Sequence, residues 1–259
     1  ETRLLPYSGR QGEYINSVSR AGLNVALMNA AELYENVTFH FNRRCVDFDC
    51  AAGQAIFCDG ERSTGETVIA TDGAGSAVRN AMMHGGIDRF DFSQKWLEHG
   101  YKELHIPPLA PNEDKANSPF AMAKDALHIW PRHKFMMIAL PNFDGSFTCT
   151  LFLSHKSAND DVDAAARQQR AFDQLAGERE VREFFEREFR DAVPMMPTLV
   201  QDFFHNPTGN LGTVKCFPWN AGGKALLLGD SAHAVVPFYG QGMNCAFEDC
   251  VALASHLDG

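Results

Sequence analysis

The stretch "ALLLGDSAHAVVPFYGQGMNCAFEDC", residues 225–250, decides the fold. The run 226–228 is too apolar for an exposed strand and predicts a buried strand of a parallel sheet. Asp230 then stands at the carboxyl end of that strand, where sheets of this kind bind their ligands. Gly240 and Gly242 allow close backbone approach ahead of a helix predicted over 241–257. The stretch predicts a ligand site, and a cap and turn that serve only the fold are the alternative.

The residue types in this stretch indicate which ligand it suits. An ionised carboxylate at Asp230 only accepts hydrogen bonds, so it suits a sugar or ribityl hydroxyl and repels a phosphate. Backbone N–H groups around 242–244 favour an acceptor or a developing negative charge. A flavin offers both a polyol chain and a ring that becomes anionic when reduced. An esterase nucleophile at Ser231 is disfavoured, because the Asp-x-x-His pattern of such enzymes occurs only before it, at 125–128.

Composition excludes several classes of function. The chain has 259 residues, is 45% hydrophobic and 22% charged, and carries a net charge of -10, which argues against nucleic-acid binding. No apolar run approaches the length that spans a bilayer. The seven cysteines are odd in number and irregularly spaced, which indicates reduced thiols in a cytoplasmic compartment. We expect no metal site, because neither C-x-x-C nor H-E-x-x-H occurs.

The rest of the chain predicts an α/β domain interrupted by an antiparallel sheet. Strands alternate with helices up to about residue 95, whereas strand-like stretches joined by loops follow without intervening helices. The expected domains are 1–95 and 211–259, which form one α/β domain, and 96–210. Expected strands lie at 12–20, 37–41, 67–71, 100–108, 126–131, 134–142, 146–153, 213–219 and 225–230, with a hairpin at 45–58 that turns near Gly53. Expected helices lie at 19–37, from Ser76, in two pieces within 159–193 with Asp160 or Asp161 as an early cap, and at 241–257.

Two further stretches combine ligand-binding residue types. "VIATDGAGSAVR", residues 68–79, repeats the order of strand, Asp-Gly and helix. Asp72 there could bind a cofactor hydroxyl or order the loop 73–76, and Arg79 could be a surface charge. In "LLPYSGRQGEYINSVSR", residues 4–20, Arg20 could pair with a phosphate or carboxylate, and Tyr7 offers a hydroxyl on an apolar body.

Together these stretches resemble the class A flavoprotein aromatic hydroxylases. "ATDGAGSAVR" resembles their Asp-Gly motif and "LLLGDSAHAVVPFYGQGMNCAFED" resembles their Gly-Asp motif. "HGYKELHIPP", "LHIWPRHKFMMIALPNFDGSFTCTLF" and "VQDFF" are similar to the members that act on L-kynurenine. The resemblance implies a p-hydroxybenzoate hydroxylase-like fold: an FAD/NAD(P)-binding, Rossmann-like domain interrupted by an antiparallel-sheet substrate domain.

The resemblance also implies an activity. FAD would be the cofactor, NADPH the co-substrate, and L-kynurenine and O2 the substrates of a monooxygenase that forms 3-hydroxykynurenine in tryptophan degradation. Because the amino group already activates the ring, the protein would supply binding, orientation and exclusion of water rather than a strong general base. A related flavin hydroxylase for another aromatic acid, and a non-catalytic flavin-fold remnant that binds a partner, are the alternatives.

The resemblance assigns roles residue by residue. Tyr7 would contact the substrate carboxylate, an apolar wall would hold the kynurenine ring, and the stretch 237–239 would cover ring and flavin. The implied substrate-binding residues are Tyr7, Leu127, Met136, Leu140, Phe152, Pro237, Phe238 and Tyr239. The implied cofactor-binding residues are Arg20, Cys45, Asp72, Gly73, Asp230, Pro237, Gly240, Gly242, Met243 and Asn244.

One family feature is missing. The family's N-terminal G-x-G-x-x-G, which seats the FAD pyrophosphate, does not occur in the chain. The chain therefore resembles the middle of a longer enzyme, and we expect it to bind FAD weakly and to be inactive by itself. The resemblance is compatible with a cytoplasmic enzyme, or with the mitochondrial outer membrane in a eukaryotic protein that carries a C-terminal anchor.

Overall fold

The computed structural model describes residues 2–10, 12–85, 87–110, 118–157 and 171–257, and they belong to two compact units. Unit 1 comprises Glu1–Thr38 and His99–Gly209, and unit 2 comprises Phe39–Glu98 and Asn210–Gly259. Each unit has a hydrophobic core of its own.

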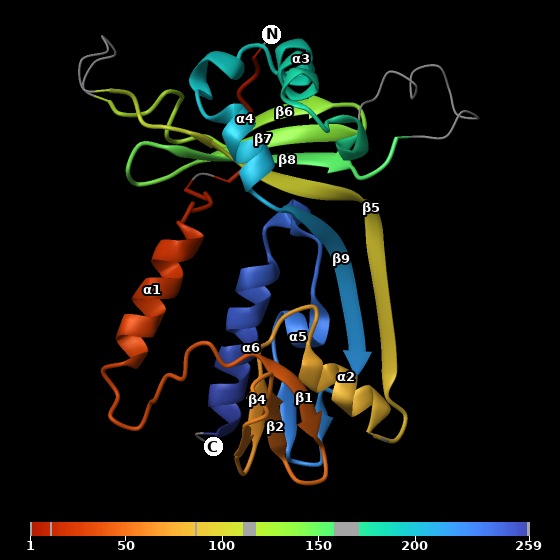
Figure 1. Cartoon of the computed structure of the whole chain (residues 1–259). Helices are drawn as coiled ribbons and strands as arrows, with labels where there is room; N and C mark the ends of the chain where they lie inside the picture. Colours follow the sequence, from red (N-terminus) through yellow and green to blue (C-terminus); the bar gives the residue numbers. More distant parts are fainter. Residues whose placement is uncertain (1, 11, 86, 111–117, 158–170, 258–259) are drawn as a thin grey trace. The chain divides into compact units, whose positions relative to one another are not determined.

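Unit 1 is built on an antiparallel sheet covered by helices on one face (Figure 1). The sheet has the order β6-β7-β8-β5-β9. Its strands are β5 (Asp91–Ile106), β6 (His128–Arg132), β7 (Phe135–Pro141), β8 (Phe147–Ser154) and β9 (Thr208–Phe217). β5 before His99 and β9 after Gly209 belong to unit 2. Met137 and Ala139 of β7 point into the core, where the covering helices bury them completely. By strand alternation, Met136 and Leu140 lie on the other face and are only partly buried.

The apolar residues of α3 (Glu178–Glu188) recur at a spacing that buries one face of the helix against the sheet. In this helix, the buried residues Val181, Phe184 and Phe185 recur at helical spacing and form one apolar stripe. Acidic residues open this helix and Arg187 lies in its last turn, which matches the helix dipole. The rings of Phe185 and Phe189 pack with their centroids 5.4 Å apart. The other helical elements between residues 171 and 209 are η1 (Phe172–Gln174), η2 (Val193–Met195) and α4 (Leu199–His205).

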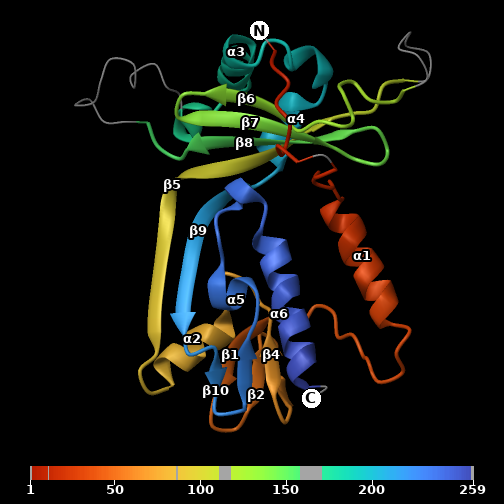
Figure 2. The ribbon, with the colours of Figure 1, turned by 180° about the vertical axis from the view of Figure 1, so that it is seen from behind.

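Unit 2 contains two small sheets with three helices (Figure 2). One sheet is the antiparallel set β1 (Cys45–Asp49), β2 (Gln54–Phe57) and β3 (Arg62–Thr64). The other has the order β10 (Asn220–Ala221), β11 (Ala225–Leu227), β4 (Val68–Ala70), and β11 runs parallel to β4. The helices are α2 (Ala77–His84), α5 (Asp230–His233) and α6 (Gly242–Leu257), and a further turn of 3-10 helix, η3, spans Pro237–Tyr239. This core includes Phe48, Met82 and Leu227.

The N-terminal segment differs from its prediction. Residues 12–19 and 37–41 form no strand, because none of the described strands pairs with them to complete their backbone hydrogen bonds. Tyr14 in the first stretch is 73% exposed. Ser19 instead accepts a hydrogen bond from the Gly22 N–H and caps α1 (Arg20–Ala31), which buries no residue. This segment clusters with unit 1, whereas 1–95 was expected to be continuous with 211–259. An ion pair of 3.7 Å between Arg20 and Glu103 links α1 to β5 within unit 1.

The predicted fold class is confirmed, and most of the predicted elements occur. The hairpin turns at Gly53, α2 follows Ser76 as its cap, and the strands of the middle region pair antiparallel. β11 and β4 pair in parallel, whereas the pairs β1–β2, β2–β3, β10–β11, β5–β8, β6–β7 and β7–β8 are antiparallel. The first of the two helices expected in 159–193, with its caps Asp160 and Asp161, falls largely on residues outside the described part.

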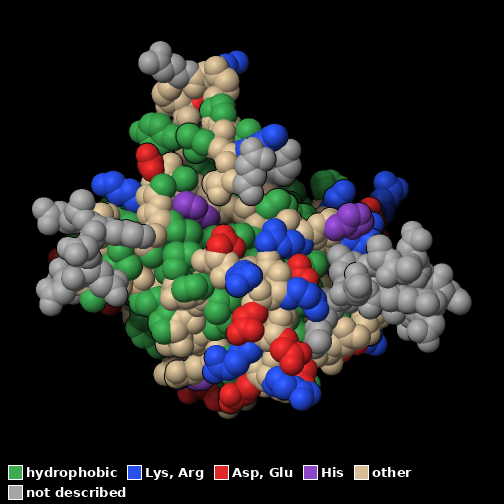
Figure 3. Space-filling model, turned by 90° about the horizontal axis from the view of Figure 1, so that it is seen from above, with side chains coloured by type: hydrophobic (Ala, Val, Ile, Leu, Met, Phe, Trp, Pro, Cys, Tyr) green, Lys and Arg blue, Asp and Glu red, His purple; other side chains and the backbone are tan. Residues whose placement is uncertain are grey.

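Two surface properties of the described residues bear on function. None of the described helices combines the length and the apolar character that crossing a bilayer requires. On the face of the molecule seen in Figure 3, acidic and basic side chains lie interspersed rather than in a basic stripe.

Candidate functional site

The turn that carries Asp230 stands at the end of a buried strand. β11 ends at Leu227, and Gly229 adopts φ +60 and ψ −140, a conformation that favours glycine. The Leu228 N–H donates to the Ala70 carbonyl at 3.0 Å, and Ser231 Oγ lies 2.7 Å from the same carbonyl oxygen. These bonds hold the turn, while the Asp230 side chain is exposed and able to accept hydrogen bonds from a ligand.

Asp72 stands at the end of the adjacent parallel strand. Leu227 of β11 pairs with Ala70 of β4, so both acidic residues follow strands whose carboxyl ends meet at the same edge. Oδ2 of Asp72 accepts a hydrogen bond from the Ala77 N–H at 2.8 Å, so this carboxylate does order the loop before α2. Gly73 has φ +81, and no atom lies within 4 Å of the place a Cβ would occupy. The backbone is open there to close approach by a ligand.

Arg79 joins the two acidic turns from inside the protein. It is 2% exposed, so the surface position weighed from the sequence is wrong. Its Nη1 donates to the Ser231 carbonyl at 2.8 Å and its Nη2 to the Ala74 carbonyl at 2.5 Å. The guanidinium lies 5.1 Å from the centroid of the Phe92 ring, and its buried Nε has no partner in the described part of the chain. Burial lowers the pKa of Arg79.

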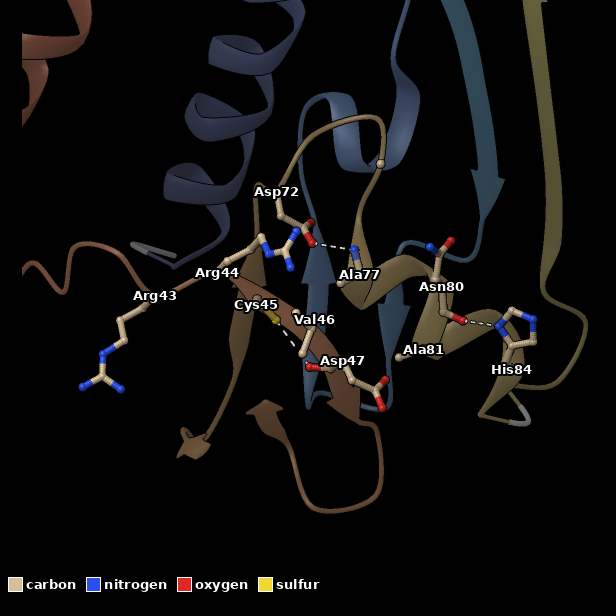
Figure 4. Close-up of a pocket in the computed structure, with 11 residues that line it drawn as sticks. Arg43, Arg44, Cys45, Val46, Asp47, Asp72, Ala77, Asn80, Ala81 and His84 are labelled. Carbon is tan, nitrogen blue, oxygen red and sulfur yellow. Dashed lines mark hydrogen bonds between the residues drawn. The ribbon is translucent and has the colours of Figure 1, made fainter. Parts of the chain in front are cut away.

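A cavity of about 770 Å³ brings Cys45 and Asp72 together. Cys45 Sγ donates to the Asp47 carbonyl at 3.3 Å, and burial raises the pKa of this thiol. Figure 4 shows Arg43 extending away from the other lining residues, in agreement with its ion pair to Asp59 at 2.7 Å. The volume is within the range of small-molecule and cofactor sites, about 300–1,000 Å³. The complete lining is Arg43, Arg44, Cys45, Val46, Asp47, Asp72, Gly75, Ala77, Asn80, Ala81 and His84.

Sequence reasoning missed five polar residues that line this cavity, namely Arg43, Arg44, Asp47, Asn80 and His84. Asn80 and His84 are four residues apart on α2, so helical spacing alone places them on one face. His84 Nδ1 lies 2.8 Å from the Asn80 carbonyl oxygen. Arg44 directly precedes Cys45, which is the first residue of β1 and also lines the cavity.

The entrance to α6 gathers the remaining cofactor residues expected in unit 2. Gly240 adopts a left-handed conformation with φ +62 and donates its N–H to the Pro237 carbonyl at 2.9 Å. α6 then begins at Gly242, and Asn244 Nδ2 donates to Gln241 Oε1 at 2.9 Å. Met243 and Phe238 are 45% and 49% exposed. The side chain of Tyr239 lies outside the described part of the structure.

The expected substrate residues of unit 1 lie mostly on the sheet face opposite α3. Phe152 of β8 pairs directly with Met136 of β7 and is 6% exposed, and Leu140 shares their face. Leu127 precedes β6 and is 39% exposed. Tyr7 lies outside any helix or strand, and its side chain is 63% exposed.

Metal binding has no support in the described residues, which contain no group of three His, Cys, Asp or Glu side chains suited to hold an ion. The site therefore consists of carboxylates, open glycines, a helix start and a cavity.

Comparison with known proteins gives one family and many relatives. A family described as "FAD binding domain" matches residues 6–258. The chain is 45% identical over 255 residues to a kynurenine 3-monooxygenase of Myxococcus xanthus, covering 96% of this chain and 50% of the relative. It is 45% identical over 248 residues to the kynurenine 3-monooxygenase of Dictyostelium discoideum, covering 95% of this chain and 50% of the relative. The chain thus spans about half the length of the curated relatives it matches.

Solved structures with the same fold are more distant in sequence. The tetrameric form of 2-methyl-3-hydroxypyridine-5-carboxylic acid oxygenase matches with a TM-score of 0.63 at 22% identity, over 88% of this chain and 54% of that chain. Klebsiella pneumoniae HpxO complexed with FAD and uric acid matches with a TM-score of 0.58 at 19% identity, over 92% and 54% of the two chains. At these identities the likeness concerns the fold.

Proposed function

The chain belongs to the family of FAD binding domains, and from this premise we propose that it forms part of a kynurenine 3-monooxygenase. The observation that carries the proposal is the 45% identity, over 96% of this chain, to a relative of that name. The reaction is the hydroxylation of L-kynurenine to 3-hydroxykynurenine with NADPH and O2. The family resemblance predicted from the three motifs is thereby confirmed, and the activity of the whole protein is our proposal.

The residues of unit 2 fit FAD. Asp230 is an exposed acceptor suited to the ribityl hydroxyls or the region next to the pyrophosphate, and the first N–H groups of α6 suit the acceptor edge of the flavin ring. Gly73 and Gly240 adopt positive φ with open space beside them, which leaves room for a ligand against the backbone. The cavity beside Cys45 and Asp72 has the volume expected of a cofactor site.

We assign the remaining cofactor roles to the same unit. Gly242, Met243 and Asn244 would lie at the pyrimidine edge of the flavin, and Pro237 would cover it. The role of Arg20 toward FAD stays a prediction, since its side chain is 86% exposed and its ion-pair partner in unit 1 is Glu103.

The domain roles follow from these assignments. Segments 39–98 and 210–259 would bind the cofactor, and the sheet of unit 1 would bind the substrate. When bound, FAD supplies the redox chemistry, accepting electrons from NADPH and activating O2 for transfer of one oxygen atom.

The protein's contribution to the reaction is positioning. The apolar face formed by Met136, Leu140, Phe152 and Leu127 would hold the aromatic ring and exclude water, and Phe238 and Tyr239 would cover it. Tyr7 would donate its hydroxyl to the substrate carboxylate. The proposed reaction requires no strong general base, because the ring amino group of the substrate already directs and activates the position beside it.

The experiment uses the protein expressed from its complete gene. We expect the purified protein to retain FAD and to consume NADPH faster when L-kynurenine is added. With isotopically labelled O2, we expect one labelled oxygen atom in 3-hydroxykynurenine. Stimulation by another aromatic acid but not by L-kynurenine would contradict the substrate, and a protein that binds no flavin would contradict the activity.

A matched pair of variants tests the substrate carboxylate contact. Tyr7→Phe is expected to raise the dissociation constant for L-kynurenine about 5- to 150-fold, which corresponds to about 1–3 kcal/mol for a lost hydrogen bond. Tyr14→Phe, in the same segment and 73% exposed, is the control and should leave it unchanged. Equal constants for Tyr7→Phe and the unmodified protein would exclude this role for Tyr7.

A further inference from the structure

Asp249 of α6 contacts the turn before Asp230 through a single carboxylate oxygen. Its Oδ2 accepts the Gly229 N–H at 2.7 Å and also lies 2.7 Å from Nε2 of His233. The side chains of Asp249 and His233 are 17% and 24% exposed, so water screens this pair only partly. These contacts link residues twenty positions apart that belong to α6 and to the entry into α5.

Both the N–H and the carbonyl of Gly229 form hydrogen bonds. Its N–H binds Asp249, and its carbonyl accepts the N–H groups of Ala232 and His233 at 2.9 Å. A Cβ at Gly229 would lie 3.1 Å from Cβ of Ala246, so α6 packs directly against this turn. With φ +60 and ψ −140, Gly229 has a conformation that glycine adopts readily and other residues rarely adopt.

The ring of His233 is also fixed. Its centroid lies 5.2 Å from that of Trp219, whose Nε1 donates to the Cys216 carbonyl at 2.8 Å. For Nε2 to donate to the carboxylate, the proton of the neutral ring must be on Nε2. His233 thus orients the carboxylate that binds Gly229, as a second layer of contacts orients a ligand-binding group in other sites.

We propose that Asp249, oriented by His233, is a positioning residue of the flavin site. Its hydrogen bonds connect the turn that carries Asp230 to α6, whose first N–H groups would face the flavin ring. The two groups that would contact the flavin, Asp230 and the start of α6, are thereby held in a fixed relative position. This inference rests on the proposed function, because it concerns the same cofactor. The turn held by these contacts is buried at Leu228, Ser231 and Ala232, whereas the Asp230 side chain is exposed, where a ligand can reach it.

The test measures flavin binding in the protein expressed from its complete gene. The variants are Asp249→Ala and Asp249→Asn, and Glu248→Gln is the control because Glu248 is an exposed carboxylate on the same helix. The readouts are the FAD dissociation constant, the visible circular dichroism of bound flavin and the melting temperature of the flavin-free protein. We expect Asp249→Ala to weaken FAD binding about tenfold or more and to alter the dichroism, and Glu248→Gln to change neither.

Conservative replacements separate positioning from folding. Asp249→Asn keeps one acceptor oxygen, and His233→Gln keeps a donor toward the carboxylate, so both should retain much tighter FAD binding than Asp249→Ala. If Asp249→Ala does not fold, a loss of affinity in His233→Leu that His233→Gln restores supports the same role. Variants that melt earlier but bind FAD as tightly as the unmodified protein, with the same dichroism, would overturn the proposal.

The outcome is distinguishable from a failure of the proposed function. If the unmodified protein binds FAD but does not hydroxylate L-kynurenine, the ratio of flavin affinities still decides the role of Asp249. If the unmodified protein binds no flavin, the proposed function fails first and this inference fails with it.

Discussion

Replacing Arg79 by Met removes the buried link between the two acidic turns. Met is similar in length and unbranched, so it can follow the path of the Arg side chain without forcing the core apart. The change deletes the donors to the carbonyls of Ala74 and Ser231, at 2.5 and 2.8 Å, in a place where the side chain is 2% exposed. Water therefore has little access to replace them.

The magnitude follows from these two contacts. A buried carbonyl left without its donor costs about 1–3 kcal/mol, so two of them cost about 2–6 kcal/mol. Two effects of the change offset part of this cost. The charge of Arg79, whose burial lowers its pKa, is no longer buried, and the buried Nε without a partner is removed. We therefore expect a net loss of about 3 kcal/mol in the free energy of unfolding, or about 6–12 °C in melting temperature.

Chemical denaturation followed by circular dichroism measures this loss. Arg62→Met is the control, because Arg62 is exposed and donates to Gln54 at the surface, and a change within about 0.5 kcal/mol is expected. Arg79→Lys should lie between the two, since an ammonium keeps the charge but lacks the planar fork. An Arg79→Met protein as stable as the Arg62→Met protein would refute the reasoning.

Three further predictions concern the core and the sheet. Burial raises the pKa of Cys149 to about 12, so the neutral thiol stabilises the folded state below pH 9, and this contribution is lost as the pH rises toward 12. Relative to Cys149→Ala, the free energy of unfolding should fall by about 1.4 kcal/mol per pH unit in that window. The same pH dependence of the free energy of unfolding in both proteins would exclude this effect. Phe185→Ala should cost about 3–5 kcal/mol in urea denaturation, because Phe185 is fully buried, and a loss below about 1 kcal/mol would show that the site collapses. Gly209→Ala should cost about 1–3 kcal/mol, because its Cβ would meet the Tyr101 ring at 2.3 Å; a Tyr101→Ala background should remove this cost, and additive losses would contradict the clash.

Local sequence patterns predicted most elements that carry the site. The apolar run before Asp230, the Asp-Gly turn at Asp72 and the glycines before α6 each specify a strand end, a turn or a helix start through interactions within a few residues. Met136 and Leu140 share a face by strand alternation, in agreement with their partial burial beside the fully buried Met137.

Alternation failed where no partner strand was present. Residues 12–20 and 37–41 alternate apolar and polar side chains, yet the structure pairs neither stretch with another strand. A strand needs hydrogen-bonding neighbours that its own sequence does not encode. Ser19 shows the competing local preference, because it caps α1 instead of continuing an extended segment.

By itself, the sequence determined where the acidic turns and the helix start occur along the chain, because glycine, aspartate and apolar spacing act locally. Only the tertiary structure decided that β4 and β11 lie side by side, that Arg79 is buried between their turns and that Asp249 reaches back to Gly229. Such partners depend on packing between segments that are far apart in the chain, and the spacing of residues within either segment does not specify them.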